Sequence, residues 1–112
     1  MSQITTHILD TSLGKPAQDV NVSLEKTTDL GWEQIGSGHT NKDGRVANLL
    51  DPEKTLVPGI YRINFDTGAY FVLKGIKAFY PSVNIVFETV DDSHYHVPLL
   101  INPFGYSTYR GS

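Results

Sequence analysis

The chain closes with YHVPLLINPFGYSTYRGS, residues 95–112, and the first half of this stretch has the pattern of a β-strand. Apolar residues occupy every second position, so one face of the strand is expected to pack against a core; they are Tyr95, Val97, Leu99 and Ile101. His94 and His96 fall on the opposite face. Proline cannot donate to a sheet ladder, so Pro98 predicts a bulge or an interruption in this strand.

The second half of the stretch is unusual for the end of a chain. Chain ends are generally polar and frayed, yet aromatic and apolar residues continue here to within four positions of Ser112. A short strand is expected from Tyr106 to Tyr109. We therefore expect the last residues to be held in place rather than loose.

The remainder of the chain repeats the strand pattern, with alternating or β-branched runs separated by Gly, Pro, Asn and Asp. This indicates an all-β sandwich. Further strands are expected at residues 4–9, 20–25, 32–40, 45–49, 59–65 and 83–89. Gly36 and Gly38 predict a bulge or a close backbone approach in the third of these. A single short helix is expected from Asp66 or Thr67 to Lys74, with Gly75 as its C-terminal cap.

Length and composition limit the classes of function. The 112 residues form one domain, residues 1–112, without repeats or linkers. Nine basic and twelve acidic residues give a formal charge of -3, which argues against nucleic acid as a partner. No apolar run is long enough to span a membrane and no secretory signal is recognisable, so a cytoplasmic protein is expected. There is no cysteine for a disulfide, a thiolate metal site or a nucleophile.

Imidazoles and one guanidinium are the candidate chemical groups. His7 and His96, with His94, are expected on sheet faces turned away from the core. The tight turn Asn41–Gly44 delivers Arg45 to the start of the next strand. Each of these residues taken alone is compatible with a solvated surface. Around His96, however, the neighbouring apolar and aromatic residues indicate that a partner covers this face.

Two chemistries remain open for these histidines from the residues alone. Imidazoles can act as general acid and base, with Arg45 as counter-charge and bidentate donor for an anionic ligand. Alternatively, His94 and His96 on one side of a strand could ligate zinc with His7 as a third ligand. A His-x-His pair is a weak metal signal, so we expect no metal and no cofactor.

Several motifs resemble the 5-hydroxyisourate hydrolases, the transthyretin-related proteins. They are Thr6–Ala17, Thr40–Arg45, Gly59–Arg62, Phe79–Pro81, His96–Leu100, Pro103–Thr108 and the terminal Tyr109–Ser112. The resemblance covers essentially the whole chain. The terminal tetrapeptide and a histidine at the position of His96 are absent from transthyretins proper, which makes the hydrolase branch the better match.

The resemblance implies a fold, an assembly and a set of site residues. The fold is a transthyretin-like sandwich of two four-stranded sheets with one short helix. The assembly is a homotetramer, a dimer of dimers, with the active sites at the dimer–dimer interface. His7, Arg45 and His96 are the implied catalytic residues. The substrate-binding residues that it implies are Tyr109, Arg110, Gly111 and Ser112.

The implied reaction is the hydrolysis of 5-hydroxyisourate to 2-oxo-4-hydroxy-4-carboxy-5-ureidoimidazoline in purine catabolism, after urate oxidation. Two other functions remain as alternatives. A transthyretin-like carrier of small aromatic ligands would share the fold, since fold alone does not decide function. An accessory sandwich for adhesion or scaffolding would leave the ordered terminus unexplained.

Overall fold

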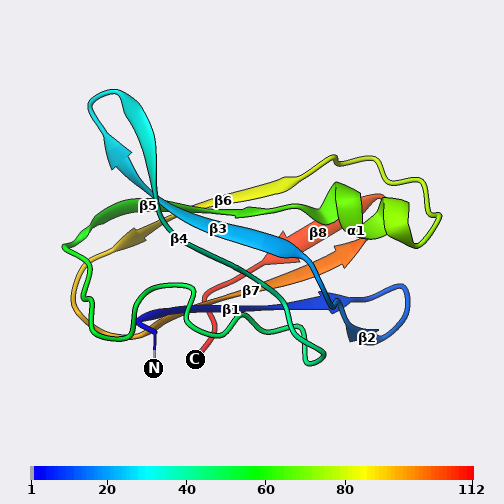
Figure 1. Ribbon diagram of the computed structural model, residues 1–112, viewed down its shortest axis with the longest axis horizontal. Coiled ribbons are helices and arrows are strands. Elements are labelled where there is room, and N and C mark those ends of the chain that lie inside the picture. The colour runs from blue at the N-terminus through cyan, green and yellow to red at the C-terminus, as the bar shows by residue number, and fades with distance from the viewer. Residues whose placement is uncertain (1) are drawn as a thin grey trace.

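The computed structural model describes residues 2–112 of the protein. It is a sandwich of two four-stranded sheets with one helix (Figure 1). The first sheet has the order β2-β1-β7-β8, and its strands are β1 (Ile4–Asp10), β2 (Lys15–Pro16), β7 (Tyr95–Asn102) and β8 (Gly105–Thr108). The second has the order β4-β3-β5-β6, with β3 (Asn21–Thr28), β4 (Gly31–His39), β5 (Gly59–Phe65) and β6 (Val83–Thr89). The all-β sandwich of two four-stranded sheets is confirmed.

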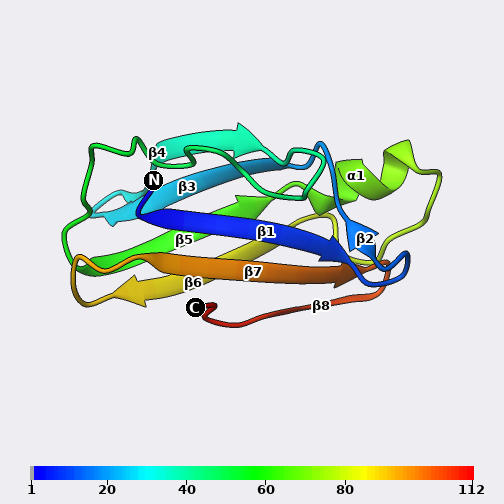
Figure 2. The ribbon, with the colours of Figure 1, turned by 90° about the horizontal axis from the view of Figure 1, so that it is seen from below.

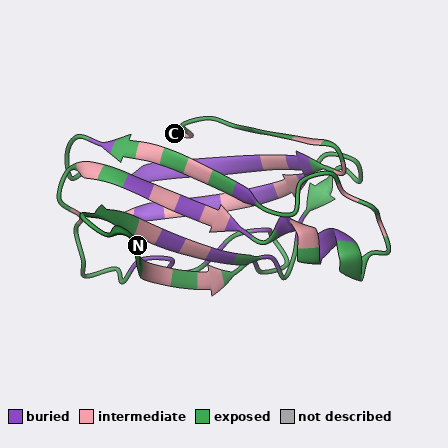
Figure 3. Ribbon diagram, turned by 90° about the horizontal axis from the view of Figure 1, so that it is seen from above, coloured by how far each residue is buried: buried purple, intermediate pink, exposed green. Residues whose placement is uncertain are grey.

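The core lies between the two sheets and follows the predicted alternation. In β1, Ile4, Thr6 and Ile8 are buried, and the residues between them are half-exposed. The apolar face of β7 is buried as well, as are Tyr61, Ile63 and Phe65 of β5. Figure 3 shows this alternation as changes of colour along single strands. Because one face of each strand is buried, the register of every strand determines which side chains reach the outside.

β1 and β7 form the centre of the first sheet and run parallel. Their register is continuous, from Ile4 opposite Tyr95 to Asp10 opposite Ile101. Figure 2 shows the two strands side by side, with β8 and the end of the chain next to β7. This pairing brings His7 and His96, 89 positions apart in the chain, onto adjacent strands.

The helix α1 (Thr67–Leu73) follows β5 as expected. Asp66 occupies the N-cap position, but its side chain makes no capping hydrogen bond. At the other end Gly75 has φ +69°, and the N–H groups of Gly75 and Ile76 donate to the carbonyls of Val72 and Phe71. This is the Schellman arrangement that favours glycine, so the predicted C-terminal cap is confirmed. Among residues 2–112, no helix has the length and apolar character needed to cross a membrane.

The strand predicted at residues 45–49 is wrong. Only Arg45 forms an isolated bridge, to His7, and Asn48 adopts a left-handed conformation with φ +57°. Leu49 and Leu50 are both buried although they are adjacent, and a strand cannot present neighbouring side chains to one core. The segment coils over the sandwich instead. The two-residue strand β2, which lies outside the predicted strands, completes the first sheet.

The interruption predicted at Pro98 occurs on one side of β7 only. The parallel pairing with β1 passes through this residue without a bulge, but the pairing with the β8 side stops at Leu99 and resumes at the bridge between His96 and Gly111. The carbonyl of His96 accepts a hydrogen bond from Gly111, so the polar backbone groups of His96 and Pro98 face the β8 side of the strand. β8 pairs with β7 only from Leu99 onward. The gap in this pairing therefore falls at the residue that has no N–H to donate.

The close approach predicted at Gly36 is confirmed. A Cβ at this position would lie 2.0 Å from the carbonyl oxygen of Leu49, and the register between β3 and β4 shifts at Leu24 and Glu25. The coiled segment that follows Arg45 is thus seated directly on β4. This contact helps to hold the segment that carries Arg45.

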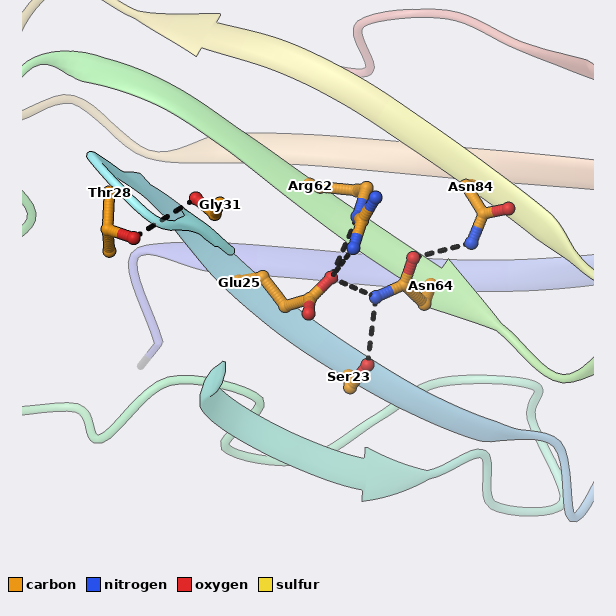
Figure 4. A network of polar contacts seen from close by, with 7 residues as sticks. All are labelled: Ser23, Glu25, Thr28, Gly31, Arg62, Asn64 and Asn84. Atoms are coloured by element: carbon orange, nitrogen blue, oxygen red, sulfur yellow. Dashed lines mark hydrogen bonds and ion pairs between the residues drawn. The ribbon is translucent and has the colours of Figure 1, made fainter. Parts of the chain in front are cut away.

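The outer face of the second sheet carries a network of polar side chains from β3, β5 and β6 (Figure 4). Glu25 accepts hydrogen bonds from Asn64 and Arg62, with 2.7 Å to Arg62 Nε. The Arg62 hydrogen bond is the main cause of the lowered pKa of Glu25. Asn84 donates to the amide oxygen of Asn64, and Asn64 donates to the Ser23 hydroxyl. The donors and acceptors pair with one another, so this face has the character of an ordinary polar surface.

Candidate active site

The outer face of the first sheet carries a cavity of about 460 Å³. Ten residues line it, from β1, the segment after the Asn41–Gly44 turn, β7 and the end of the chain: Thr5, Thr6, His7, Arg45, Val46, His94, His96, Tyr109, Gly111 and Ser112. Its size is in the range of small-molecule sites. The structure thus brings together His7, Arg45, His96, Tyr109, Gly111 and Ser112 from the sequence prediction. Their functional roles remain predictions.

The two predicted catalytic histidines are in direct contact. His7 Nδ1 lies 2.7 Å from His96 Nε2, and the two rings are nearly parallel, with an interplanar angle of 16°. Since both atoms are ring nitrogens, one of them donates and the other accepts. His96 Nδ1 lies 2.7 Å from the Thr5 hydroxyl. Both nitrogens of His96 are therefore engaged, which orients its ring.

Arg45 is positioned by the turn that precedes it. Gly44 has φ +74°, as expected for its turn, and its carbonyl accepts a hydrogen bond from the N–H of Ile8. A bridge between Arg45 and His7 then sets the arginine beside β1. Within residues 2–112 its guanidinium makes no hydrogen bond or ion pair, although it lines the cavity. Its five donors are available for an anionic or carbonyl-rich ligand.

Electrostatics at the site favour neutral imidazoles. The pKa of His7 is lowered by burial and then by the charge of Arg45. The pKa of His96 is lowered by burial, then by His7, Arg45 and His94. A neutral imidazole has a lone pair with which it can accept a proton, so both residues are suited to base catalysis near neutral pH.

The end of the chain closes one side of the cavity. The N–H of Gly111 donates to the carbonyl of His96 over 2.8 Å, which forms a bridge beside the face that carries His7 and His96. The expectation of a terminal segment held in place is confirmed. Arg110 is the exception among the predicted binding residues, because its guanidinium lies over the Tyr95 ring, 4.3 Å from the centroid, and does not line this cavity. Its part in substrate binding stays a prediction.

The sequence interpretation did not assign a role to Thr5. Its hydroxyl is within hydrogen-bond distance of two imidazoles, His96 Nδ1 at 2.7 Å and His94 Nε2 at 2.8 Å. The available signal was the alternation of β1, which places Thr5 and His7 on the same outer face. What the sequence does not contain is the pairing of β1 with β7, which puts Thr5 opposite His96.

The zinc alternative for the three histidines finds no support in this geometry. No group of three His, Cys, Asp or Glu side chains among residues 2–112 is arranged to hold a metal ion. His96 is not oriented as a metal ligand, because its two ring nitrogens face Thr5 and His7 at hydrogen-bond distance. The arrangement is one of proton donors and acceptors.

Comparison with known proteins agrees with the resemblance noted from the motifs. A 5-hydroxyisourate hydrolase of Salmonella dublin is 49% identical over 110 residues, which cover 97% of this chain and 80% of that protein. The structure of Klebsiella pneumoniae 5-hydroxyisourate hydrolase superposes with a TM-score of 0.86 at 39% identity, covering 100% of this chain and 94% of that one. Sea bream transthyretin in complex with thyroxine gives a TM-score of 0.90 at 34% identity, over 97% and 94% of the two chains.

The backbone is thus about equally similar to a hydrolase and to a transthyretin, so the fold does not separate these two branches. The sequence relative at 49% identity carries the hydrolase name. A family profile described as HIUase/Transthyretin matches residues 4–111. This chain belongs to the HIUase/transthyretin family.

Proposed function

We propose that this protein is a 5-hydroxyisourate hydrolase. It opens the ring of 5-hydroxyisourate at an amide-like C–N bond to give 2-oxo-4-hydroxy-4-carboxy-5-ureidoimidazoline, in purine catabolism after urate oxidation. The observation that carries the proposal is the contact of His7 with His96 at 2.7 Å, in one cavity with the unpaired guanidinium of Arg45. Hydrolases among the relatives of this chain, such as that of Salmonella dublin, agree with it.

The proposed mechanism uses the imidazole pair to activate water. One imidazole removes a proton from water as its oxygen attacks the ring carbonyl carbon, and Arg45 stabilises the negative charge that develops on the carbonyl oxygen. The C–N bond then breaks, and the leaving nitrogen takes a proton from the imidazole pair. Water thus supplies OH to carbon and H to nitrogen, and no metal takes part in this scheme.

We also propose that the active unit is a homotetramer, a dimer of dimers whose dimer–dimer interface covers the cavity. Its support is the exposure of large side chains around the cavity and near the chain end. Tyr109, which lines the cavity, is 58% exposed, and Tyr106, on β8 of the same sheet, is 42% exposed. Exposed apolar surface of this kind marks interfaces in soluble proteins. In the assembly, Tyr109, Arg110, Gly111 and Ser112 shape the closed pocket.

The function is tested by the decay of 5-hydroxyisourate, generated freshly from urate with urate oxidase and followed by ultraviolet absorbance. Spontaneous decay is the baseline. We expect faster decay with the protein, unaffected by prior treatment with a chelator. If the chelator abolishes the acceleration, the zinc alternative is favoured. A decay rate equal to the baseline would contradict the hydrolase proposal.

The role of the imidazole pair is tested with His96→Asn. We expect a loss of turnover of about 10²-fold or more, the usual size of an acid–base contribution. His39→Asn is the matched control, because His39 is an exposed histidine on β4 of the other sheet. Unchanged turnover in His96→Asn would exclude this mechanism.

A carrier of small aromatic ligands is the second candidate, favoured by the likeness of the backbone to thyroxine-bound sea bream transthyretin. The lining of the cavity argues against it. A carrier for aromatic ligands requires mostly apolar contacts, whereas three histidines and an arginine line this site. If the decay assay is negative and an aromatic ligand binds, the carrier is the better assignment.

A further inference from the structure

Four side chains of the site form one continuous hydrogen-bonded chain. His7 Nδ1 lies 2.7 Å from His96 Nε2, His96 Nδ1 lies 2.7 Å from Thr5 Oγ1, and Thr5 Oγ1 lies 2.8 Å from His94 Nε2. These hydrogen bonds run from His7, which is half-buried, to His94, which is exposed, and both histidines line the cavity. His94 and Thr5 have no role in the mechanism described above.

Counting protons along this chain leaves two arrangements when all groups are neutral. The Thr5 hydroxyl has one proton, so it donates to one imidazole and accepts from the other. If it donates to His94 Nε2, then His96 Nδ1 carries hydrogen and donates to Thr5, and His96 Nε2 accepts from His7 Nδ1. If it donates to His96 instead, every bond in the chain reverses.

The two arrangements differ in the protonation of His7 Nε2, the ring nitrogen that takes no part in these hydrogen bonds. Within the described residues this atom has no hydrogen-bond partner, and His7 lines the cavity. In the first arrangement a neutral His7 carries its hydrogen on Nδ1, so Nε2 is a base. In the second the hydrogen sits on Nε2, which is then an acid. Reversal of the hydrogen bonds therefore converts His7 Nε2 from a base into an acid.

We propose that Thr5 and His94 are positioning residues that complete a proton relay from His7 through His96 to His94, at the more exposed edge of the cavity. The proposal rests on the hydrolase function proposed above. When water attacks, its O–H bond breaks and His7 Nε2 gains the proton. His7 Nδ1 then passes its proton to His96 Nε2, His96 Nδ1 to Thr5 Oγ1, and the Thr5 hydroxyl to His94 Nε2.

The positive charge then resides on His94 until the C–N bond breaks. At that step His7 Nε2 gives its proton to the leaving nitrogen, and the three transfers run backward to restore neutral His94. The groups that face the chain explain why the charge moves outward. Burial and the charge of Arg45 lower the pKa of both His7 and His96, and His94 has the most exposed side chain of the three in the single chain. A cation is therefore better solvated at the outer end.

The kinetic test compares two substitutions of Thr5. Thr5→Val keeps the shape of the side chain and removes the hydroxyl, so we expect kcat to fall about tenfold or more. KM should stay within about twofold, because the Thr5 hydroxyl is engaged with His94 and His96 and the substitution preserves the shape of the cavity wall. Thr5→Ser keeps a hydroxyl and is expected to retain most of kcat. His94→Gln should resemble Thr5→Val. Thr27→Val and His39→Gln, on the second sheet, are the matched controls.

A spectroscopic test does not depend on activity. Long-range 1H–15N spectra of histidine rings distinguish the two neutral tautomers. In the unmodified protein we expect His7 with hydrogen on Nδ1, and in Thr5→Val a changed tautomer population at His7, which Thr5 does not contact directly. The controls should leave the spectrum of His7 unchanged.

The outcomes separate this inference from the function on which it rests. If the unmodified protein does not accelerate 5-hydroxyisourate decay, the proposed function fails, and the spectra alone decide whether the four groups are coupled. If the protein is active but Thr5→Val retains full kcat, the relay is overturned and the hydrolase remains. An unaltered His7 spectrum in Thr5→Val overturns the relay in either case.

Discussion

The positive charge of a single residue, Arg45, lowers the pKa of two imidazoles. The pKa of His7 is lowered first by burial and second by Arg45, and Arg45 also contributes to the lowered pKa of His96. The base must be neutral to accept a proton. Activity therefore persists as the pH falls through the usual histidine value of about 6.5 and is lost only below it.

Replacement of this arginine tests the electrostatic argument. In Arg45→Gln we expect the acid limb of kcat/KM to move to higher pH, since a cation that disfavoured protonation has been removed. The limb should stay below about 6.5, because burial, the larger cause, remains. The measurement is kcat/KM between about pH 5 and 8, where histidine titrates.

Lys77→Gln is a suitable control for the loss of one positive charge, because Lys77 is exposed in the loop after α1. Its pH profile should coincide with that of the unmodified protein. An acid limb in Arg45→Gln that does not move would show that Arg45 has no electrostatic influence on the base.

At the scale of elements, the important contact is between β7 and the segment that follows β8. Gly111 lies so close to His96 that a Cβ would be 2.6 Å from His96 Cδ2. The backbone bridge between the two residues fixes this approach. A side chain at position 111 must therefore displace the ring that contacts both Thr5 and His7.

Gly111→Ala is expected to reduce kcat by about 10²-fold, the cost of misplacing a catalytic group by about 1 Å. The midpoint of thermal unfolding should change little, because Gly111 follows β8 and is not part of the hydrophobic core. Gly105→Ala is the control, since its Cβ would meet nothing closer than 3.8 Å. Full activity in Gly111→Ala would contradict the positioning role of the terminal segment.

For the whole molecule, the proposed tetramer makes activity depend on protein concentration. A cavity that is completed by a partner works only in the assembled state, and mass action dissociates an assembly on dilution. We expect the specific activity to fall over the same dilution range in which sedimentation velocity shows loss of the tetramer. A monomer that retains full specific activity would contradict the proposed assembly.

The sequence predicted the parts of the fold that depend on local alternation. The buried face of β1, the whole of β5 and β6, and the glycine cap of α1 agree with the structure. The errors concern residues whose state depends on distant partners. Residues 45–49 coil because they pack onto β4, and β7 continues through Pro98 because its pairing with β1 is unbroken while only the pairing on the β8 side is interrupted.

The same division holds for the candidate site. His7, Arg45 and His96 could be named from motifs, and the two-residue period of a strand put both histidines on the faces opposite the core, although His96 is itself buried. The chain from His94 through Thr5 to His96 could not be named, because it requires the parallel register that sets Thr5 opposite His96. Nor could the sequence show that Arg110 lies over Tyr95 while Gly111 contacts His96.

The sequence by itself determined which residues face the core and which chemical groups are available, since both depend on the two-residue period of a strand and on side-chain chemistry. Only the tertiary structure decided which of these groups touch. Contacts between residues 89 to 91 positions apart follow from strand order and register, and these are set by packing of the whole sandwich. The site of this protein consists mainly of such contacts.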